Sequence, residues 1–273
     1  MKKTLLTICL VWMCFSLSAQ KIIDLSGKWS FSIDRQDNGE KEKWFSHTLN
    51  DFINLPGSMP EKLKGDEVTA KTQWTGSLYD SSYYYNPYME KYRKEGNIKF
   101  PFFLTPDKHY VGAAWYQKEV NIPADWKGER ILLFLERPHI ETTVWVNGQK
   151  TGMQNSLCVP HQYDITHYVR PGKCTITIRV DNRIKEINVG PDSHSITDQT
   201  QGNWNGIVGR ICLQTTPKTY FDDIQIYPEP EQKLARVKVV IKGTGTAKVK
   251  LSAESFNTDK KHICLLYTSD AAD

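Results

Sequence analysis

Short apolar stretches separated by turn residues constrain the fold of this chain most strongly. Thr175–Asp181 (TITIRVD) alternates apolar and polar residues after the turn Pro171-Gly172, as expected of a half-buried strand. Thr142–Val146 (TTVWV) ends at Asn147-Gly148, a dipeptide that adopts the positive φ angles of a tight hairpin. No window of about eleven residues has a helical period between Asp24 and Thr216. The sequence therefore predicts an all-β fold.

Further strands are predicted on both sides of Pro217. Before it they are Lys28–Ile33, Ala114–Val120 and the continuous apolar run Ile131–Leu135, which we expect to be buried on both faces. After it the pattern predicts three regular antiparallel strands, at Phe221–Tyr227, Arg236–Ile241 and Ala247–Ala253. Because three strands make a poor core, a second domain is expected to begin there without being completed.

One long segment, between Leu55-Pro56-Gly57 and Trp115, shows no strand pattern. It contains the tyrosine-rich run GSLYDSSYYYNPYMEKYRKEG and the run KFPFFLTPDKHY. A loop of this length inside a compact domain usually either has a function or contains elements that the sequence pattern has failed to reveal. Its tyrosines are interpreted either as a platform that stacks on sugar rings or as anchors that hold an irregular loop to the sheet.

Length and charge limit the classes of function. The 273 residues are enough for one large β domain or two ordinary ones. Basic side chains exceed acidic ones by four and form no dense run, so we expect no nucleic-acid partner. Aromatic residues make up 11% of the chain, which fits either a large core or the binding of flat ligands such as sugars.

Residues 1–19 have the parts of a secretory signal peptide. MKK is the charged start, TLLTICLVWMCFSL the apolar core, and Leu17-Ser18-Ala19 the cleavage site before Gln20. The apolar run is short for a membrane span, although an uncleaved anchor is the alternative. We expect an exported protein, periplasmic or secreted or at the cell surface, with no membrane contact beyond the signal peptide.

The residue types that bind metals and cofactors form no known pattern. The sequence contains no GxSxG, HExxH or P-loop motif. Cys158, Cys174 and Cys212 lack CxxC spacing, so we expect buried thiols rather than a disulfide framework or a zinc site. The sequence therefore predicts no metal and no cofactor.

Two acidic residues lie close together, at Glu136 and Glu141, on either side of the stretch RPHI. Glycoside hydrolysis needs two carboxyl groups held about 5 Å apart for retention or about 6.5 to 9.5 Å apart for inversion. Each of these glutamates borders an apolar strand, however. Ion pairs with neighbours such as Arg137 explain them more simply than catalysis.

Residues 194–213 (HSITDQTQGNWNGIVGRICL) are the best candidate for a binding site. The first half of this stretch is polar and surrounds a single tryptophan. Amide and carboxylate side chains can bond sugar hydroxyls, and the indole offers a stacking face. Since Asn and Gly also form ordinary turns, both readings stand. The candidate substrate-binding residues are Asp198, Gln199, Asn203 and Trp204.

The ordered set of motifs resembles the amino-terminal sugar-binding domain of glycoside hydrolase family 2. The matching series covers roughly residues 24–216 and runs LSGKWSF, LPGSM, AAWYQKEVNIPADW, LERPHIETTVWVNGQKTG, PHQYDITHYVRPG, TITIRVDNR and SITDQTQGNWNGIVGRICL. The resemblance implies a jelly-roll β-sandwich over residues 20–217 and the start of an immunoglobulin-like sandwich over 218–262. It further implies a following (β/α)₈ barrel whose two glutamates perform a retaining mechanism.

In the β-galactosidase branch of this family, a similar loop carries Asp-Gln, then Trp, then Gly-Ile, and its aspartate helps to shape the sugar pocket. Asp198-Gln199, Trp204 and Gly206-Ile207 follow that order, with two extra residues between Gln199 and Trp204. The resemblance therefore implies that Asp198 contributes to a sugar pocket, whereas Gly209-Arg210 belongs to the scaffold. It places no catalytic residue in this chain.

The last residues differ in kind from the rest. Cys264–Asp273 (CLLYTSDAAD) resembles a reading frame of a transposase sequencing-library adapter, so residues 263–273 are set aside as an adapter-derived tail. We expect an amino-terminal fragment of an exported glycosidase of terminal β-linked sugars, inactive by itself, with a glycan as its partner and an oligomeric state that the sequence does not reveal. The alternatives are a free-standing carbohydrate-binding module and a surface adhesion protein.

Overall fold

The computed structural model describes residues 20–76, 79–185, 190, 192–243 and 249–254, together with the backbone of residues 263–268. The predicted signal peptide and residues 269–273 of the predicted tail lie outside the described residues. Within the described part of the chain, no helix is long and apolar enough to cross a membrane.

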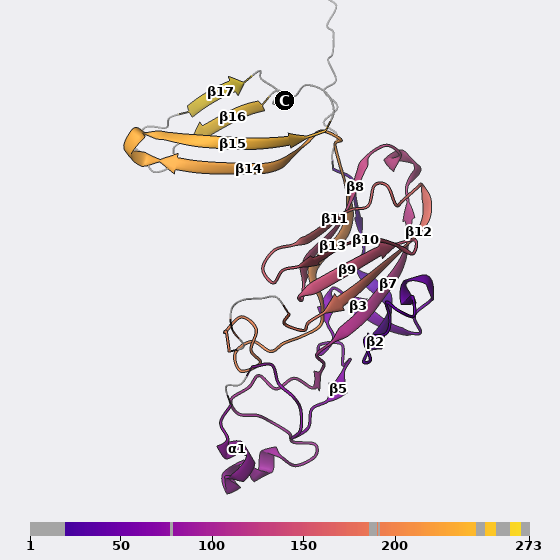
Figure 1. The fold of residues 1–273 in the computed structure, drawn as a ribbon, viewed down its shortest axis with the longest axis vertical. Coiled ribbons are helices and arrows are strands. Elements are labelled where there is room, and N and C mark those ends of the chain that lie inside the picture. The colour runs from indigo at the N-terminus through magenta and orange to yellow at the C-terminus, as the bar shows by residue number, and fades with distance from the viewer. Residues whose placement is uncertain are drawn as a thin grey trace, which may run out of the picture.

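Two antiparallel sheets form a β-sandwich (Figure 1). The first sheet has the order β1 (Ile22–Asp24), β13 (Gly206–Thr216), β8 (Arg130–Pro138) and β11 (His161–Asp164), with β4 (Gly57–Ser58) also on β13. The second has the order β10 (Gln149–Asn155), β9 (Glu141–Val146), β12 (Gly172–Asp181), β7 (Ala113–Ile122), β2 (Gly27–Asp34) and β3 (Asp51–Leu55). The predicted all-β sandwich is confirmed.

The main core lies between these two sheets. The six-stranded sheet contributes Trp29, Phe31 and Tyr116, and the five-stranded sheet contributes Leu133 and Ile211 among others. All of these side chains are almost fully buried, and burying such large apolar surfaces is the main favourable term in folding. As predicted, the run Ile131–Leu135 in β8 is buried along its whole length.

Strand β12 is buried on both faces, although its alternating sequence predicts burial on one. Ile176 and Ile178 face the main core, but Thr177 and Arg179 between them are buried as well. The outer face of this sheet is covered by a second apolar cluster in which Leu49, Trp115 and Trp145 are packed by Trp44 and Phe45. The covering loop includes the short helix η1 (Trp44–Ser46).

Asn147-Gly148 forms the predicted tight hairpin between β9 and β10. Asn147 has φ 50° and Gly148 has φ 77°, and Val146 pairs with Gln149 directly across the turn. Two successive positive φ angles are the signature of the type I′ turn.

The cysteine prediction is partly wrong. Cys174 and Cys212 are buried thiols, but Cys158 is exposed because it lies in the irregular connection between β10 and β11. All three are unbridged.

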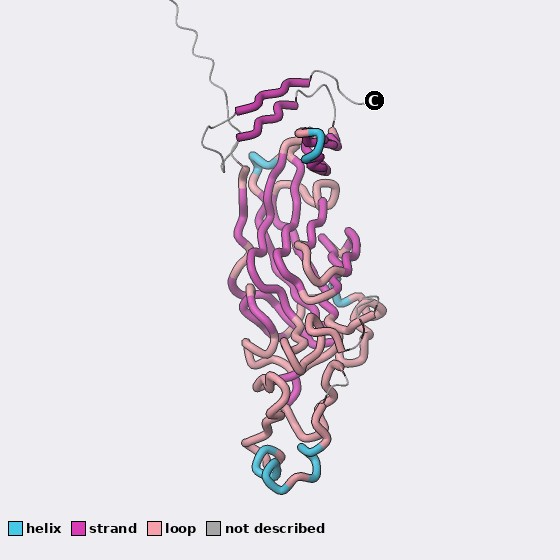
Figure 2. Tube along the Cα trace, turned by 90° about the vertical axis from the view of Figure 1, so that its left-hand side faces the viewer, coloured by secondary structure: helices cyan, strands magenta, loops and turns pink. Residues whose placement is uncertain are grey.

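The long irregular segment forms a lobe, residues 59–112, at one end of the sandwich (Figure 2). Its few regular elements are β5 (Asp66–Glu67), α1 (Ser82–Tyr85), η2 (Pro87–Tyr92) and β6 (Lys108–His109). Its aromatic rings pack mainly on one another. Tyr83 stacks on Phe100 with ring centroids 4.4 Å apart, and Trp74 packs against both Phe100 and Phe103. The lobe therefore has a small core of its own rather than being held down by the sheet.

The strands after residue 217 lie at the other end of the sandwich (Figure 1). β14 (Tyr220–Glu229) pairs with β15 (Leu234–Lys242), and β16 (Val249–Glu254) pairs with β17 (Ile263–Thr268). The expected three strands are thus present, but β16 takes its partner from the apolar segment that was set aside as tail and not from β15. Two further short helices are η3 (Ala124–Trp126) and η4 (Pro230–Gln232).

Candidate functional site

Most of the buried polar side chains of the sandwich lie at the end from which the lobe extends. In the six-stranded sheet this end is marked by Asp34, Ala113, Glu141 and Asp181, which are paired with one another across the strands. In the five-stranded sheet it is marked by Gly206, which pairs with Ser58. We call this region the loop end. Residues 192–205, including the four candidate binding residues, lie there.

Asp198 is buried and joins the lobe to the polar loop. Its carboxylate Oδ2 accepts the backbone N–H of Thr75 at 2.6 Å, and Oδ1 accepts the backbone N–H of Asn203. The backbone N–H of Asp198 in turn donates to the carbonyl of Thr75 at 3.1 Å. Since only 1% of Asp198 is exposed, the structure places this carboxylate inside the protein as an acceptor for two backbone amides.

Asn203 is also buried and belongs to the same network. Its Nδ2 donates to the carbonyl of Asn182 and to Thr75 Oγ1, each at 3.0 Å, and its Oδ1 accepts from Asn182 Nδ2 at 3.0 Å. Asn182 also donates to the carbonyl of Tyr110. Asp198 and Asn203 therefore fix the shape of the loop end.

Gln199 and Trp204 keep part of their surface accessible. The Trp204 ring stacks on the imidazole of His139, with centroids 4.6 Å apart and an interplanar angle of 19°. Gln199 Oε1 is buried without a hydrogen-bond partner. Of the four candidates, Asp198 and Asn203 therefore hold the loop in shape, whereas Gln199 and Trp204 are partly exposed at its surface.

Unpartnered polar atoms gather at this end. Among the described residues, the buried side-chain atoms without a hydrogen-bond partner are Trp74 Nε1, His109 Nε2, His139 Nε2, Asn155 Oδ1 and Gln199 Oε1. The rings of Trp74 and His109 pack together with their centroids 4.7 Å apart. His109 Nε2 lies 3.5 Å from Asp198 Oδ2. Because buried polar groups in proteins are nearly always hydrogen-bonded, this concentration points to polar groups supplied by a ligand or by another part of a larger protein.

His139 is neutral at physiological pH. Burial lowers its pKa to about 4, and this effect outweighs the opposing hydrogen bond with Asn203 and the charge of Asp198. The Trp204 indole therefore rests on an uncharged imidazole ring. A neutral ring can hydrogen-bond a hydroxyl group as either donor or acceptor.

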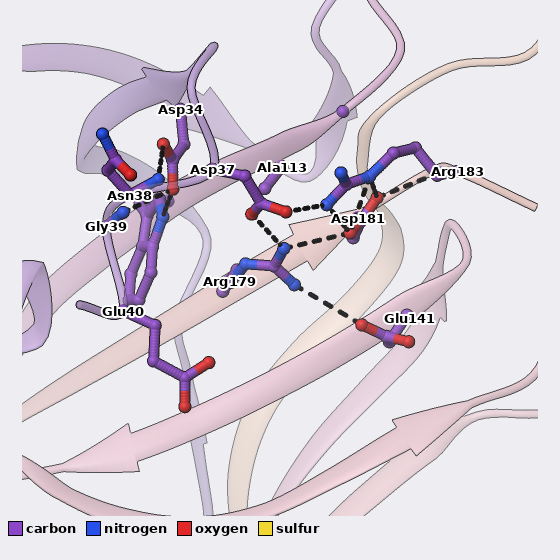
Figure 3. Close-up of polar contacts among 12 residues, drawn as sticks. Asp34, Asp37, Asn38, Gly39, Glu40, Ala113, Glu141, Arg179, Asp181 and Arg183 are labelled. Carbon is purple, nitrogen blue, oxygen red and sulfur yellow. Dashed lines mark hydrogen bonds and ion pairs between the residues drawn. The ribbon is translucent and has the colours of Figure 1, made fainter. Parts of the chain in front are cut away.

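An ion-pair cluster stabilises the neighbouring strand ends (Figure 3). Arg179 and Arg183 share the carboxylates of Asp37 and Asp181 at 2.6 to 3.0 Å. Burial would raise the pKa of Asp181, but hydrogen bonds from Arg183 and Lys185 hold it well below its usual range. Each carboxylate in the cluster is paired with cations, so the cluster fixes the carboxyl-terminal end of β12 and the loop after β2.

The same cluster corrects the predicted partner of one glutamate. Glu141 pairs with Arg179 at 3.4 Å and with Lys185 at 2.9 Å, rather than with Arg137. Sheet pairing is the reason. Asp181 lies directly opposite Glu141, so Arg179 and Lys185, which pair with Asp181, also lie beside Glu141. Glu136 likewise bonds Arg210, through the backbone N–H at 2.9 Å and the side chain at 3.2 Å.

A cavity of about 480 Å³ lies between the lobe and the sandwich. Asp34, Arg35 and Arg183 line it from the sandwich, and Asp66 and His109 line it from the lobe. His109 therefore stands between this cavity on one side and Asp198 on the other. Charged and polar side chains thus line part of the space between the lobe and the loop end.

Sequence reasoning missed Trp74, Thr75, His109, His139 and the ion-pair cluster. One signal was available, since Asp181-Asn182-Arg183 is a polar run directly after a strongly alternating strand, and such positions are often functional. No local pattern marks Trp74, Thr75 or His109, because only the path of the lobe brings Thr75 and His109 to Asp198 and Trp74 to His109.

The comparisons with known proteins agree with this architecture. The profile of the family described as "Glycosyl hydrolases family 2, sugar binding domain" matches residues 22–217. The human β-glucuronidase is 24% identical over 266 residues, which cover 87% of this chain and 35% of that protein. The β-glucuronidase of Paenibacillus borealis is 24% identical over 222 residues, which cover 76% of this chain and 31% of that protein.

Solved structures show the same fold. A β-glucuronidase from an uncultured Clostridium sp. superposes with a TM-score of 0.58 at 19% identity, covering 93% of this chain and 40% of that one. The Ruminococcus gnavus β-glucuronidase in complex with uronic isofagomine gives a TM-score of 0.59 at 16% identity, covering 93% of this chain and 39% of that one. The chain spans about a third of the length of the curated relatives it matches. Through the match over residues 22–217, the chain belongs to glycosyl hydrolase family 2 and contains the sugar-binding domain of that family.

Proposed function

We propose that this chain is the amino-terminal part of an exported glycosidase that releases terminal β-linked sugars, with β-glucuronides as the substrate class. Family membership and the names of the relatives support a glycosidase, and those names favour a glucuronide, a sugar that the sequence alone left undetermined. The observation that carries the proposal is the set of unpartnered buried polar atoms at the loop end, of which His109 Nε2 lies 3.5 Å from Asp198 Oδ2.

In this proposal the loop end forms one wall of the sugar pocket. Asp198 and Asn203 hold the loop in shape, Trp204 offers a ring face, and Gln199 Oε1 accepts a hydrogen bond from a sugar hydroxyl. The two glutamates of a retaining mechanism would lie on a (β/α)₈ barrel outside residues 20–262. The chain then contributes to substrate binding and leaves the bond-breaking step to the barrel.

The first test is enzymatic and uses nitrophenyl β-glycosides. Purified residues 20–262 are expected to release no nitrophenol above background from the glucuronide, galactoside, glucoside or mannoside. The product of the complete reading frame is expected to hydrolyse the glucuronide best. Release of nitrophenol by residues 20–262, or a complete protein without glycosidase activity, would contradict the proposal.

The second test addresses the pocket wall in the complete protein. Trp204→Ala and Gln199→Ala are each expected to lower kcat/KM for the nitrophenyl glucuronide about tenfold or more, equivalent to about 1.4 kcal/mol of transition-state binding. Lys173→Ala is the control, because Lys173 lies at the opposite end of β12 in an exposed ion pair with Glu119. Equal activity in all three variants would show that the loop end does not contribute to the sugar pocket.

Export is tested separately from activity. Expression of the whole chain in a bacterial host is expected to yield a mature protein outside the cytoplasm that begins at Gln20, as read by mass spectrometry of its first peptide. An intact Met1 in the purified protein would contradict the proposed signal peptide.

A further inference from the structure

The lobe exposes a group of tyrosines that neither the core nor the loop end uses. Tyr79 is 61% exposed, Tyr84 52%, Tyr85 73% and Tyr88 85%. They lie on or beside α1 and η2, at the part of the lobe farthest from the strands after residue 217 (Figure 1). We call these four residues the tyrosine patch.

The patch stands on a fixed base. Beneath it, Tyr83 is fully buried, stacks on Phe100 and donates its hydroxyl to the carbonyl of Tyr92 at 2.9 Å. Arg93 donates to the carbonyl of Tyr83, which ties the end of η2 back to α1. The backbone of α1 and η2 is therefore held in place by short-range bonds, so that a ligand does not have to order the loop that carries the exposed rings.

Further contacts fix the backbone of Tyr88 and the ring of Tyr84. Asn86 Oδ1 accepts the backbone N–H of Tyr88 at 3.0 Å and begins η2. Tyr84 makes edge-on contacts with Tyr83 at 5.1 Å and with Tyr79 at 6.4 Å. Tyr85 and Tyr88, the two most exposed rings, follow directly along the chain.

The lobe that carries the patch is joined to the loop end. Thr75 exchanges backbone and side-chain hydrogen bonds with Asp198, and Trp74 links Phe100 of the lobe core to His109. A ligand on the patch and a ligand at the loop end would thus be held by one connected unit.

The charge of the segment decides between classes of ligand. Residues 79–108 carry five basic and four acidic side chains, so there is no strong field to attract a nucleic acid or an anionic membrane. Phenol rings with exposed faces and hydroxyl edges match the alternating C–H faces and hydroxyls of pyranose rings. They combine a large apolar surface with a polar tip.

We propose that the tyrosine patch is a glycan-binding surface, distinct from the loop end, which stacks on pyranose rings of an oligosaccharide or polysaccharide chain. Tyr85 and Tyr88 are its main contacts, and Tyr84 is the supporting ring. The proposal concerns binding alone and is independent of the glycosidase activity proposed above.

The test is affinity electrophoresis of the purified chain through gels that contain soluble xylan, β-glucan, polygalacturonate or hyaluronan. At least one polysaccharide is expected to retard the chain. The double variant Tyr85→Ala/Tyr88→Ala is expected to weaken the apparent affinity about tenfold or more. Tyr85→Phe/Tyr88→Phe, which keeps the rings, is expected to stay within about threefold of the wild type.

Two controls distinguish binding from loss of structure. Phe52→Ala removes a 47% exposed aromatic ring from β3, outside the lobe, and is expected to leave retardation unchanged. Circular dichroism is expected to be the same for all variants, since the changed side chains are exposed. The absence of retardation by every polysaccharide, or equal retardation of the double alanine variant, would overturn the proposal. So would an oligomer of the chain that the alanine variant disperses, since the patch would then bind a second copy.

Discussion

At the scale of single residues, the loop end depends on polar groups buried with definite partners. Asp198 was predicted as a ligand for sugar hydroxyls, but both of its oxygens accept backbone N–H groups. Its part in substrate binding stays a prediction, and in this structure its contribution is to position Gln199 and Trp204. Gln199 and His139, at the same end of the sandwich, each keep a buried side-chain atom without a hydrogen-bond partner.

Removal of the Asp198 carboxylate is predicted to destabilise the domain. Asp198→Ala leaves the backbone N–H groups of Thr75 and Asn203 buried without acceptors, at a cost of about 2 to 4 kcal/mol in the free energy of unfolding. Urea denaturation measures this loss. Gln201→Ala is the control in the same loop, where the side chain is exposed, and a loss as small as that of the control would show that the two bonds contribute little.

Protonation of His139 is predicted to make stability depend on pH. Its pKa of about 4 in the folded protein lies below the 6.5 expected when it is unfolded. Between these values the unfolded chain binds more protons, so the free energy of unfolding falls as the pH drops from about 6.5 to about 4.

The variant His139→Gln cannot gain this proton. The stability advantage of wild type over His139→Gln is therefore expected to shrink by on the order of 2 kcal/mol between about pH 7 and about pH 4.5, as measured by urea denaturation. His194→Gln, at an exposed histidine, serves as the control. A difference that stays constant with pH would show that the folded protein accommodates the charged imidazole.

At the scale of elements, the start of β13 sets the distance between the polar loop and the sandwich. Gly206 has φ +146° and pairs with Ser58 of β4, so that its Cα lies directly against backbone. The Asn205 side chain beside it donates to the carbonyls of Gly112 and Val180, at 2.9 Å each. These contacts fix where the loop leaves the sheet.

Substitution of Gly206 is predicted to disrupt this junction. A Cβ there would lie 2.5 Å from the carbonyl oxygen of Gly57, a backbone atom that cannot rotate away. Gly206→Ala is expected to cost about 2 to 4 kcal/mol in thermal or urea unfolding. Gly27→Ala is the matched control, with φ +100° but no atom within 4 Å, and is expected to cost only about 1 to 2 kcal/mol of backbone strain. Equal losses would mean that strain alone, and not the close approach, governs both sites.

At the scale of the whole molecule, the two ends of the sandwich differ in character. One end carries the lobe and the polar site, and the other continues into the β14–β15 pair (Figure 1). That pair exposes Phe221, Ile224, Ile226, Tyr227 and Leu234 at 44 to 64% of their surface. Apolar strands exposed in this way tend to associate.

The length of the expressed chain is therefore predicted to control its association. Residues 20–217 are expected to be monomeric, since both sheets share a buried core. Residues 20–262 are expected to elute as larger, concentration-dependent species in size-exclusion chromatography with light scattering. Replacement of Phe221 and Ile226 by Ser in the longer chain is expected to restore the monomer. Monomeric behaviour of the unmodified longer chain would contradict this prediction.

The sequence by itself determined the elements whose signals are local. Alternation in β12, the apolar run in β8 and the Asn147-Gly148 turn each predicted an element that the structure contains. The ordered motifs also predicted the family, which the match over residues 22–217 confirms. These features could be predicted because strand period and turn chemistry depend on neighbours in the chain.

The tertiary structure alone decided which polar residues share a site and which of them already have hydrogen-bond partners within the protein. Thr75 and His109 meet Asp198 across more than eighty positions of sequence, and Arg179 finds Asp37 only through the sheet and the loop after β2. Contacts of this kind depend on how the lobe and the sheets come together. That arrangement buried Asp198 and Asn203 and left part of Gln199 and Trp204 accessible.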